Sequence, residues 1–316
     1  MKGYVQATVA TRHDVTDDLA VFTLDWGAEG VAPYAPGQYV TLALERDGRT
    51  VKRAYSIVSA PHEPLMELHI EHVEDGRMTP GLFDLQPGDA VWARRKIVGH
   101  FMQEATKRAH VMMATVTGAA PFISMIRAQQ HALMTGALDE PATSRFLLLH
   151  GASDPAELEP YTTELADLAN AAPWLTYVPC ISRPWNHPAW SGERGRVGDV
   201  LRKHLDAWTS THGLDVADVV GYACGNPQMI EHAKGVLKRT GLSPDAIREE
   251  KYYTEAAPTQ PTALAPGPVF EAAQAARRAK PVPTAPPGKR PPGVGALRSV
   301  KPGSVGGPPP RKPGAR

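Results

Sequence analysis

The first part of the chain carries six short stretches in which apolar and polar residues alternate. A period of two is typical of β-strands that bury one face, and turn residues separate these stretches. Six short strands at this spacing predict a small antiparallel β-barrel, which we place at residues 1–104. The stretches are Tyr4–Thr11, Leu19–Trp26, Gln38–Leu44, Val51–Ser59, Leu65–Val73 and Ala90–Ile97.

From about Ala109 the pattern changes to apolar runs that alternate with helical periodicity. Such alternation predicts an α/β domain with a doubly wound parallel sheet, expected over residues 105–255. Ligands of such sheets bind beyond the carboxyl ends of the strands. The expected strands are 111–116, 145–151, 175–182, 219–225 and 247–253, with helices at 117–133, 161–171, 197–205 and 228–240.

The composition changes at the end of this second domain. Of the 31 prolines, 15 follow Glu255, and residues 257–316 carry ten Lys or Arg against a single acid, Glu271. The near-neutral net charge of +1 therefore hides a basic tail and an acidic remainder. A Pro/Gly-rich, poorly apolar stretch buries too little surface to offset its ordering entropy. We predict that residues 256–316 are a disordered tail that binds acidic partners or surfaces through its charge.

Several classes of protein are excluded by what the sequence lacks. It has neither a charged leader with an apolar run nor a stretch of about eighteen apolar residues, so we expect a cytoplasmic protein without a transmembrane segment. Cys180 and Cys224 are too few for an iron–sulfur cluster or a four-cysteine zinc site, and the histidines lack metal-ligand spacing. We expect no metal, so any electron partner is a separate molecule.

The strand that begins at Arg53 is unusual in the side chains it brings together. Arg53 offers a planar fork of donors for a phosphate, Tyr55 a flat ring for stacking, and Ser56 a hydroxyl that donates or accepts. An arginine on a barrel strand can also be a solvated residue, and Tyr55 an ordinary packed aromatic. The combination favours a site for a planar, phosphorylated cofactor.

A second candidate lies at a predicted helix start. Thr79 and Pro80 suit a helix whose cap is the threonine hydroxyl and whose first residue is proline. A helix N-terminus is a ready anion site, and Arg77 precedes this one. The alternative is a capped helix that only closes one end of the barrel.

Three loops follow the expected parallel strands. The first, TVTGAAP at 115–121, has small residues that allow a close backbone approach, except at Val116. The second, ISRPW at 181–185, precedes Arg194 and Arg196, whose guanidinium groups suit a phosphate dianion. In the third, CGNPQM at 224–229, Gly-Asn-Pro ends a strand and starts a helix, and Cys224 can also be an ordinary core residue.

Together, these motifs resemble the bacterial branch of the ferredoxin–NADP reductase superfamily of flavoproteins over residues 3–253. The resemblance rests on RAYS at 53–56, PGQYV at 36–40 and the three loops, in the family's order. It implies FAD on the barrel, with contacts from Arg53, Ala54, Tyr55, Ser56, Gly76, Arg77, Met78 and Thr79, the last four at the pyrophosphate. It implies NADP(H) contacts from Thr117, Gly118, Pro121, Ser182, Arg183, Arg194, Arg196, Cys224, Gly225 and Asn226.

The resemblance also implies an activity. Hydride would pass between NADP(H) and flavin N5, with Ser56 near N5, Cys224 setting the approach of the nicotinamide, and Glu250 as a proton-relay acid. Tyr252 or Tyr253 would cover the flavin face. Single electrons would then pass to ferredoxin or flavodoxin.

Two departures from the family keep other functions open. Val116 stands where the family has glycine, and a Trp-rich insert follows Arg183. One alternative is an NADH-dependent reductase component of an oxygenase. The other is a flavin-binding regulatory or electron-transfer subunit without direct nicotinamide turnover.

Overall fold

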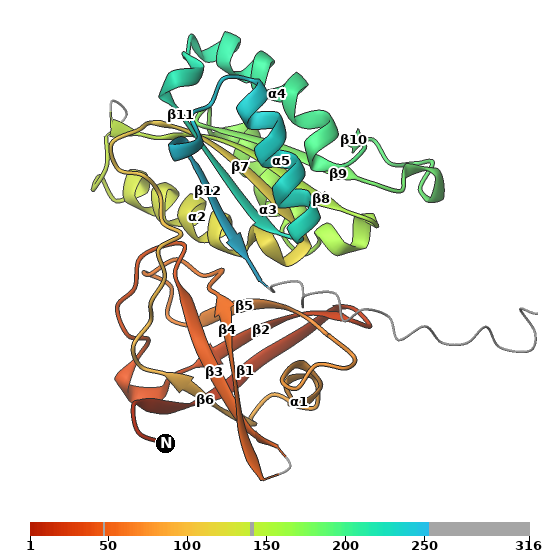
Figure 1. Ribbon diagram of the computed structural model, residues 1–316. Helices are drawn as coiled ribbons and strands as arrows, with labels where there is room; N and C mark the ends of the chain where they lie inside the picture. Colours follow the sequence, from red (N-terminus) through yellow and green to blue (C-terminus); the bar gives the residue numbers. More distant parts are fainter. Residues whose placement is uncertain (47, 140–141, 253–316) are drawn as a thin grey trace, which may run out of the picture. The chain divides into compact units, whose positions relative to one another are not determined.

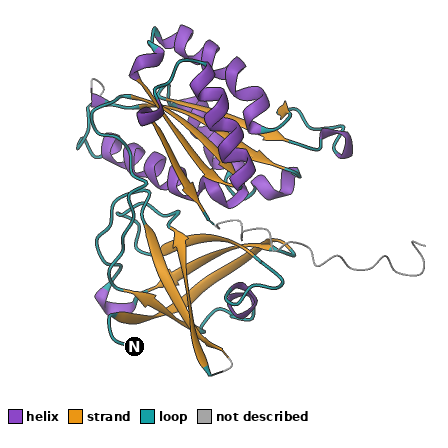
Figure 2. Ribbon diagram, viewed as in Figure 1, coloured by secondary structure: helices purple, strands orange, loops and turns teal. Residues whose placement is uncertain are grey.

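The computed structural model describes residues 1–46, 48–139 and 142–252. Tyr253 and the predicted tail at 256–316 lie outside the described residues. The first sheet has six antiparallel strands in the order β4-β3-β6-β1-β2-β5, which confirms the predicted antiparallel β-domain (Figure 2). A single bridge between Ile57 and Leu68 connects the end of β4 with β5. The strands are β1 (Tyr4–Thr16), β2 (Leu19–Asp25), β3 (Tyr39–Arg46), β4 (Arg49–Ser56), β5 (Met66–Glu71) and β6 (Ala90–Arg94).

The predicted cap of the short helix α1 (Thr79–Phe83) is wrong. Thr79 is itself the first helical residue, and the preceding Met78 makes no side-chain cap hydrogen bond. The Thr79 hydroxyl instead accepts a hydrogen bond from the Val73 N–H at 2.9 Å and lies 3.2 Å from the Val73 carbonyl oxygen. It therefore ties the loop after β5 to the helix, while Met78 and Leu82 are buried in the barrel core.

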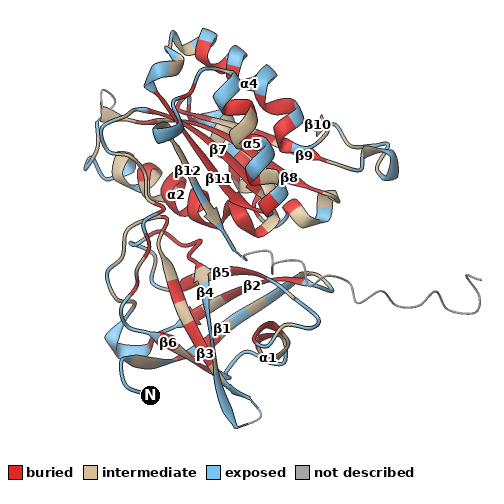
Figure 3. Ribbon diagram, in the orientation of Figure 1, coloured by how far each residue is buried: buried red, intermediate tan, exposed pale blue. Residues whose placement is uncertain are grey.

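The second sheet is entirely parallel, as the strand–helix alternation predicts. Its strand order is β10-β9-β8-β7-β11-β12, and the short edge strand β10 was not expected. The central strands are buried along almost their whole length (Figure 3). Helices α2 and α3 cover one face, and α4 and α5 cover the other (Figure 1). The strands are β7 (Ala109–Thr115), β8 (Arg145–Ala152), β9 (Leu175–Ile181), β10 (Glu193–Arg194), β11 (Val219–Gly225) and β12 (Ile247–Lys251); the helices are α2 (Ala120–Met134), α3 (Thr162–Ala171), α4 (Val197–His212) and α5 (Pro227–Arg239).

Helix α4 is longer than the expected 197–205. Trp208 and Thr209 continue its buried face for another turn, and Gly213 ends it in the left-handed region at φ 61°. None of the helices within 1–46, 48–139 and 142–252 is both long and apolar enough to cross a bilayer.

The barrel contacts the parallel-sheet domain through the segment that follows β4. The Ser59 carbonyl oxygen accepts hydrogen bonds from Ser124 Oγ of α2 at 2.7 Å and from the Tyr34 hydroxyl at 2.9 Å. Val58 and Phe101 belong to the same buried apolar cluster as the inner face of α2. Because these contacts are buried, they fix where β4 ends relative to the second sheet.

An ion-pair cluster centred on Arg127 of α2 lies beside this contact. Its guanidinium donates two hydrogen bonds of 2.7 Å to the Glu164 carboxylate and lies 3.4 Å from Glu67 of β5. Glu67 also accepts a 2.9 Å hydrogen bond from the Tyr161 hydroxyl. The Arg127 side chain is only 17% exposed, so its charge is poorly screened by water.

We expect Arg127→Met to lower the free energy of unfolding by about 2 kcal/mol, because half-buried carboxylates lose their shared cation. Arg202→Met is the matched control, since the Arg202–Asp206 pair of α4 is exposed to solvent. That control should change stability by less than about 0.5 kcal/mol. Urea unfolding of the flavin-loaded protein measures both values, and equal effects would contradict a special role for the cluster.

Candidate active site

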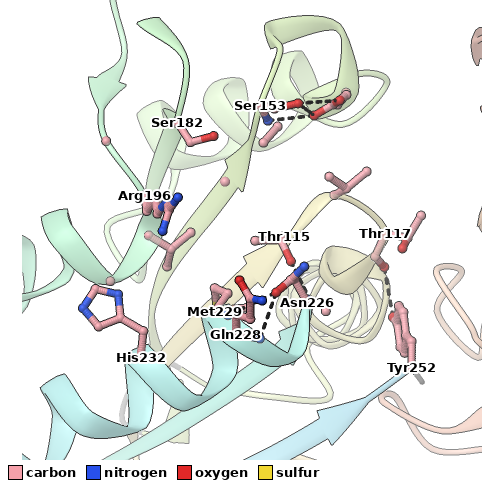
Figure 4. Close-up of a pocket in the computed structure, with 18 of the residues that line it drawn as sticks. Thr115, Thr117, Ser153, Ser182, Arg196, Asn226, Gln228, Met229, His232 and Tyr252 are labelled. Atoms are coloured by element: carbon pink, nitrogen blue, oxygen red, sulfur yellow. Dashed lines mark hydrogen bonds between the residues drawn. The ribbon is translucent and has the colours of Figure 1, made fainter. Parts of the chain in front are cut away.

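A cavity of about 440 Å³ lies at the carboxyl ends of the parallel strands (Figure 4). Sheet order runs outward from β7 through β8 to β9 on one side and through β11 to β12 on the other. The point where the direction reverses is where open α/β sheets bind ligands. Its walls are formed by the first turns of α4 and α5 and by residues at the strand ends: Thr115–Thr117 at the end of β7, Gly151–Ser153 at the end of β8, Ser182 after β9, and Gly225 and Asn226 at the end of β11.

Two helices begin at this cavity. Helix α5 is capped by Asn226, whose side chain accepts hydrogen bonds from the N–H groups of Gln228 at 2.9 Å and Met229 at 3.3 Å. Helix α4 follows Arg196, which lines the cavity. The positive ends of two helix dipoles and a guanidinium make this wall suitable for phosphate groups.

The arginines expected to read a phosphate are not all at the cavity. Ser182 and Arg196 line it. Arg194 instead donates from Nη2 to the carbonyl oxygens of Pro188 and Trp190, both at 3.1 Å, and so braces the Trp-rich insert. Arg183 is exposed at the start of the insert and does not line the cavity.

Close backbone packing explains two of the expected glycines. A Cβ atom on Gly118 would lie 2.2 Å from the Cys224 carbonyl oxygen, and one on Gly225, at φ 121°, would lie 2.3 Å from Thr115 Oγ1. That Oγ1 also accepts a 2.9 Å hydrogen bond from the Asn226 N–H. The loop after β7 therefore sits directly on the end of β11, with Thr117 at the cavity and Pro121 buried in the first turn of α2.

Strand β4 presents the side chains expected to hold a flavin. Arg53 and Ala54 are exposed, Tyr55 is half-buried against the barrel core, and Ser56 is buried. Among the described residues, the Arg53 guanidinium is hydrogen-bonded to the Lys52 carbonyl oxygen alone, at 2.8 Å. Its remaining donors fit an anionic ligand.

Most residues of the segment expected to hold the pyrophosphate have a structural role in the fold. A Cβ atom on Gly76 would lie 2.7 Å from the Val73 carbonyl oxygen. Met78 is a core residue, and the Thr79 hydroxyl is engaged with Val73. Arg77 is exposed and is the side chain of this segment best able to meet a phosphate.

The three residues expected at the reaction centre do come together. Ser56 Oγ donates a 2.9 Å hydrogen bond to Glu250 Oε1, and Glu250 is paired in register with Cys224 on the neighbouring strand. Burial raises the pKa of Glu250, although the Ser56 hydrogen bond opposes this shift. Burial and the nearby carboxylate also raise the pKa of the Cys224 thiol well above its usual range. Cys224 is thus a neutral thiol, suited to positioning and not to nucleophilic attack.

Tyr252 follows β12 and connects this centre with the cavity. Its hydroxyl donates a 2.9 Å hydrogen bond to the Thr117 carbonyl oxygen (Figure 4). The residue as a whole is 38% exposed, while burial of the phenol raises its pKa well above the usual value. The other expected aromatic, Tyr253, lies outside the described residues.

Sequence reasoning missed two histidines near the cavity. His150 is fully buried at the end of β8, 3.1 Å from the Val116 carbonyl oxygen. His232 of α5 lines the cavity so close to α4 that a Cβ atom on Gly198 would lie 2.4 Å from its Nδ1. The only signal for His150 was a titratable residue in the otherwise apolar run RFLLLHG.

Comparison with known families and proteins agrees with this geometry. Residues 6–103 match the family model described as an oxidoreductase FAD-binding domain, and residues 112–235 match an oxidoreductase NAD-binding domain. The chain is therefore a two-domain oxidoreductase with an FAD-binding and an NAD-binding domain.

Similarity to individual proteins shows which family of oxidoreductases the chain belongs to. The chain is 30% identical to the flavodoxin/ferredoxin–NADP reductase of Escherichia coli (strain K12), over 73% of this chain and 88% of that enzyme. It is 32% identical to the reductase component of phenol 2-monooxygenase from Pseudomonas sp. (strain CF600), over 71% of this chain and 59% of that protein. The fold matches a ferredoxin–NADP⁺ reductase from Neisseria gonorrhoeae with a TM-score of 0.67 and 22% identity, covering 80% of this chain and 100% of that one. The chain belongs to the ferredoxin/flavodoxin–NADP reductase family.

The buried Glu250 predicts a pH-dependent stability. Its pKa in the folded protein is raised above the value of about 4.3 for a free glutamate. The unfolded chain then ionises first, so the wild type loses stability as the pH rises from about 4 through the folded-state pKa. Glutamine does not titrate. The stability of Glu250→Gln relative to wild type should therefore increase with pH in urea unfolding of the flavin-loaded protein.

Glu249→Gln is the control for this measurement. It removes an exposed carboxylate on the same strand that is paired with Lys234. At neutral pH it should lower the free energy of unfolding slightly, because the ion pair with Lys234 is lost. A Glu250→Gln difference that stayed constant between about pH 4 and pH 8 would show that the carboxyl is not perturbed by burial.

Proposed function

We propose that this protein is an FAD-dependent reductase that transfers hydride between NADP(H) and flavin N5 and exchanges single electrons with ferredoxin or flavodoxin. The observation that carries the proposal is the meeting of Ser56 from the barrel with Glu250 and Cys224 from the parallel sheet. When bound, the nicotinamide and the flavin supply the hydride transfer and the one-electron steps. The protein supplies binding, orientation and the placement of protons.

In this proposal, residues 1–104 hold FAD. Arg53 and Arg77 are exposed cations for its phosphates, and Tyr55 is a half-buried ring beside them. Ser56 Oγ faces Glu250, so the hydroxyl is held where it can donate to the carboxylate or exchange a proton with it. The raised pKa of Glu250 favours this carboxyl as the proton-holding group.

Residues 105–255 hold the nicotinamide nucleotide in the same proposal. The cavity, the starts of α4 and α5, and Ser182 with Arg196 supply donors for a dinucleotide with an additional phosphate, which favours NADP(H) over NAD(H). Cys224 is a small neutral side chain that allows close approach. Tyr252 covers the junction between Thr117 and the reaction centre and helps to exclude water.

The charge of the barrel supports docking of an acidic carrier. Exposed Arg46, Lys52 and Arg94 lie on the β4-β3-β6 half of the sheet, which also carries the expected flavin residues. Ferredoxins and flavodoxins are usually acidic, so these cations would speed encounter even though the two folded domains are acidic overall.

A second candidate is the NADH-dependent reductase component of an oxygenase. The identity with the phenol 2-monooxygenase reductase component favours it, although this chain spans only 59% of that protein. Cofactor preference separates the two candidates, because NAD(H) has no 2′-phosphate for Arg196 to bind.

We expect stepwise anaerobic addition of NADPH to bleach the visible flavin bands of the purified protein at lower concentrations than NADH. Arg196→Gln should raise the KM for NADPH about tenfold to a hundredfold, because a charged hydrogen bond to phosphate is lost, and should change the KM for NADH little. Arg194→Gln is the matched control, since Arg194 faces the insert. A preference for NADH would support the oxygenase reductase. A flavin that neither nucleotide bleaches would support a regulatory subunit.

Reversing the charge of Lys52 and Arg94 together should lower the second-order rate of flavodoxin reduction about tenfold at low ionic strength and flatten its salt dependence. Lys238→Glu, at the far end of α5, changes one charge of the same sign away from the flavin residues. That control should leave the rate within about twofold. Stopped-flow kinetics over a series of salt concentrations measure both, and an unchanged salt dependence would place the carrier elsewhere.

A further inference from the structure

Val116 has the only positive φ angle of any non-glycine residue in the described part of the chain, at 46°. This left-handed conformation is strongly disfavoured for a β-branched residue, because its branched Cβ crowds the backbone. Backbone in such a region persists only where the surroundings impose it, and it concentrates at functional sites. Val116 lines the cavity at the carboxyl end of β7, so this strained residue lies at the candidate functional site.

Three consecutive residues of this loop are held by three different elements. Thr115 Oγ1 accepts from the Asn226 N–H at the start of α5, and the Thr117 carbonyl accepts from the hydroxyl of Tyr252 after β12. Between them, the Val116 carbonyl oxygen lies 3.1 Å from His150 Nε2 on β8. Of the three contacts, only that of His150 is made to the strained residue itself.

The partners of His150 determine its protonation. A carbonyl oxygen can only accept, so Nε2 carries the proton and donates it to Val116. Nδ1 lies 3.3 Å from the Tyr177 hydroxyl, which satisfies the other side of the ring. Complete burial lowers the pKa of His150 to about 4, so the ring is a neutral, fixed donor near neutral pH.

The side chain of Val116 fixes the loop from the other side. It packs against the buried cluster of Ala152, Leu158 and Ile181 and forms part of the cavity wall. A left-handed residue followed by helical residues forms a turn in which successive N–H groups make a concave anion site. Rotation of the Val116 peptide out of this conformation would remove that arrangement.

We propose that His150 is a positioning residue for the nucleotide cleft, holding Val116 in its left-handed conformation so that the loop Thr115–Ala119 is preorganised for the phosphates of the nucleotide. This inference rests on the proposed function for the identity of the ligand. The hydrogen bond matters because residue 116 is valine. A glycine at this position would adopt the same φ without being held.

The test is a double-mutant cycle in the flavin-loaded protein, with NADP⁺ binding measured by calorimetry. His150→Leu should raise the Kd about tenfold in the wild-type background, because the loop relaxes and binding must reorder it. In the Val116→Gly background, the same substitution should raise the Kd by less than about threefold. A purely structural role for His150 predicts the same ratio in both backgrounds, which would overturn the inference.

Two further variants separate the hydrogen bond from burial. His150→Gln keeps an N–H donor and should bind NADP⁺ within about threefold of wild type. Tyr177→Phe removes the second partner of His150 without touching Val116 and should also leave the Kd nearly unchanged. A His150→Gln protein as weak as His150→Leu would overturn the inference.

Stability without nucleotide tests the strain independently of the ligand. Alanine is ordinarily the more stable choice over glycine, but at a left-handed position the order reverses. Val116→Gly should therefore unfold at higher urea concentration than Val116→Ala, and the opposite order would remove the premise of strain. If the wild type binds neither NADP⁺ nor NAD⁺, the proposed function fails, and this comparison still decides the strain at Val116.

Discussion

The arrangement of the site depends on the buried contact between the end of β4 and helix α2. The Ser59 carbonyl accepts from Ser124, and the Arg127 cluster joins carboxylates of both domains beside it. Ser56 lies only three residues before Ser59, so a chain fixed at Ser59 has little freedom at Ser56. The 2.9 Å hydrogen bond from Ser56 to Glu250 is a further contact between the same two domains. An oxidoreductase whose two cofactors bind different domains needs such a rigid contact, because a displacement of about 1 Å between reacting groups can cost about a hundredfold in rate.

Burial then sets the chemistry of the side chains that meet there. Glu250, Cys224 and Tyr252 all have raised pKa values, mainly because burial disfavours their charged forms. The centre consequently contains groups able to hold protons and lacks a thiolate nucleophile. Charge is placed at its margins instead, with Arg196 and two helix N-termini at the cavity and exposed cations on the β4 side of the barrel. These cationic margins suit the phosphate groups of the two cofactors.

Periodicity predicted the strands and helices because each element buries one face, and burial leaves its period in the sequence. The six barrel strands and the parallel arrangement of the second sheet followed from it. Local motifs singled out Gly225 and Asn226, which line the cavity, and Gly118, which packs against the end of β11, since these residues act through the backbone next to them. The long-range contacts were beyond such reasoning. Arg194 and Arg196 look equivalent in sequence, yet only the fold of the Trp-rich insert shows that Arg194 is used to brace it. Thr79 looked like a cap because its alternative partner, Val73, is visible only in the folded chain.

Val116 shows how a departure from a family pattern acquires a meaning only in three dimensions. In the sequence, a valine in place of glycine suggested an altered or looser approach of the nucleotide to the backbone. The structure keeps the glycine-like φ of 46° and adds a buried imidazole that engages the residue's carbonyl oxygen. Contacts with neighbouring residues thus hold Val116 in a left-handed backbone conformation that glycine adopts without restraint. The packing of Val116 against Ala152 and Ile181 offsets part of the cost of this strained backbone. The valine and the histidine lie 34 positions apart in the chain, so their dependence on each other is a property of the fold and of neither motif alone.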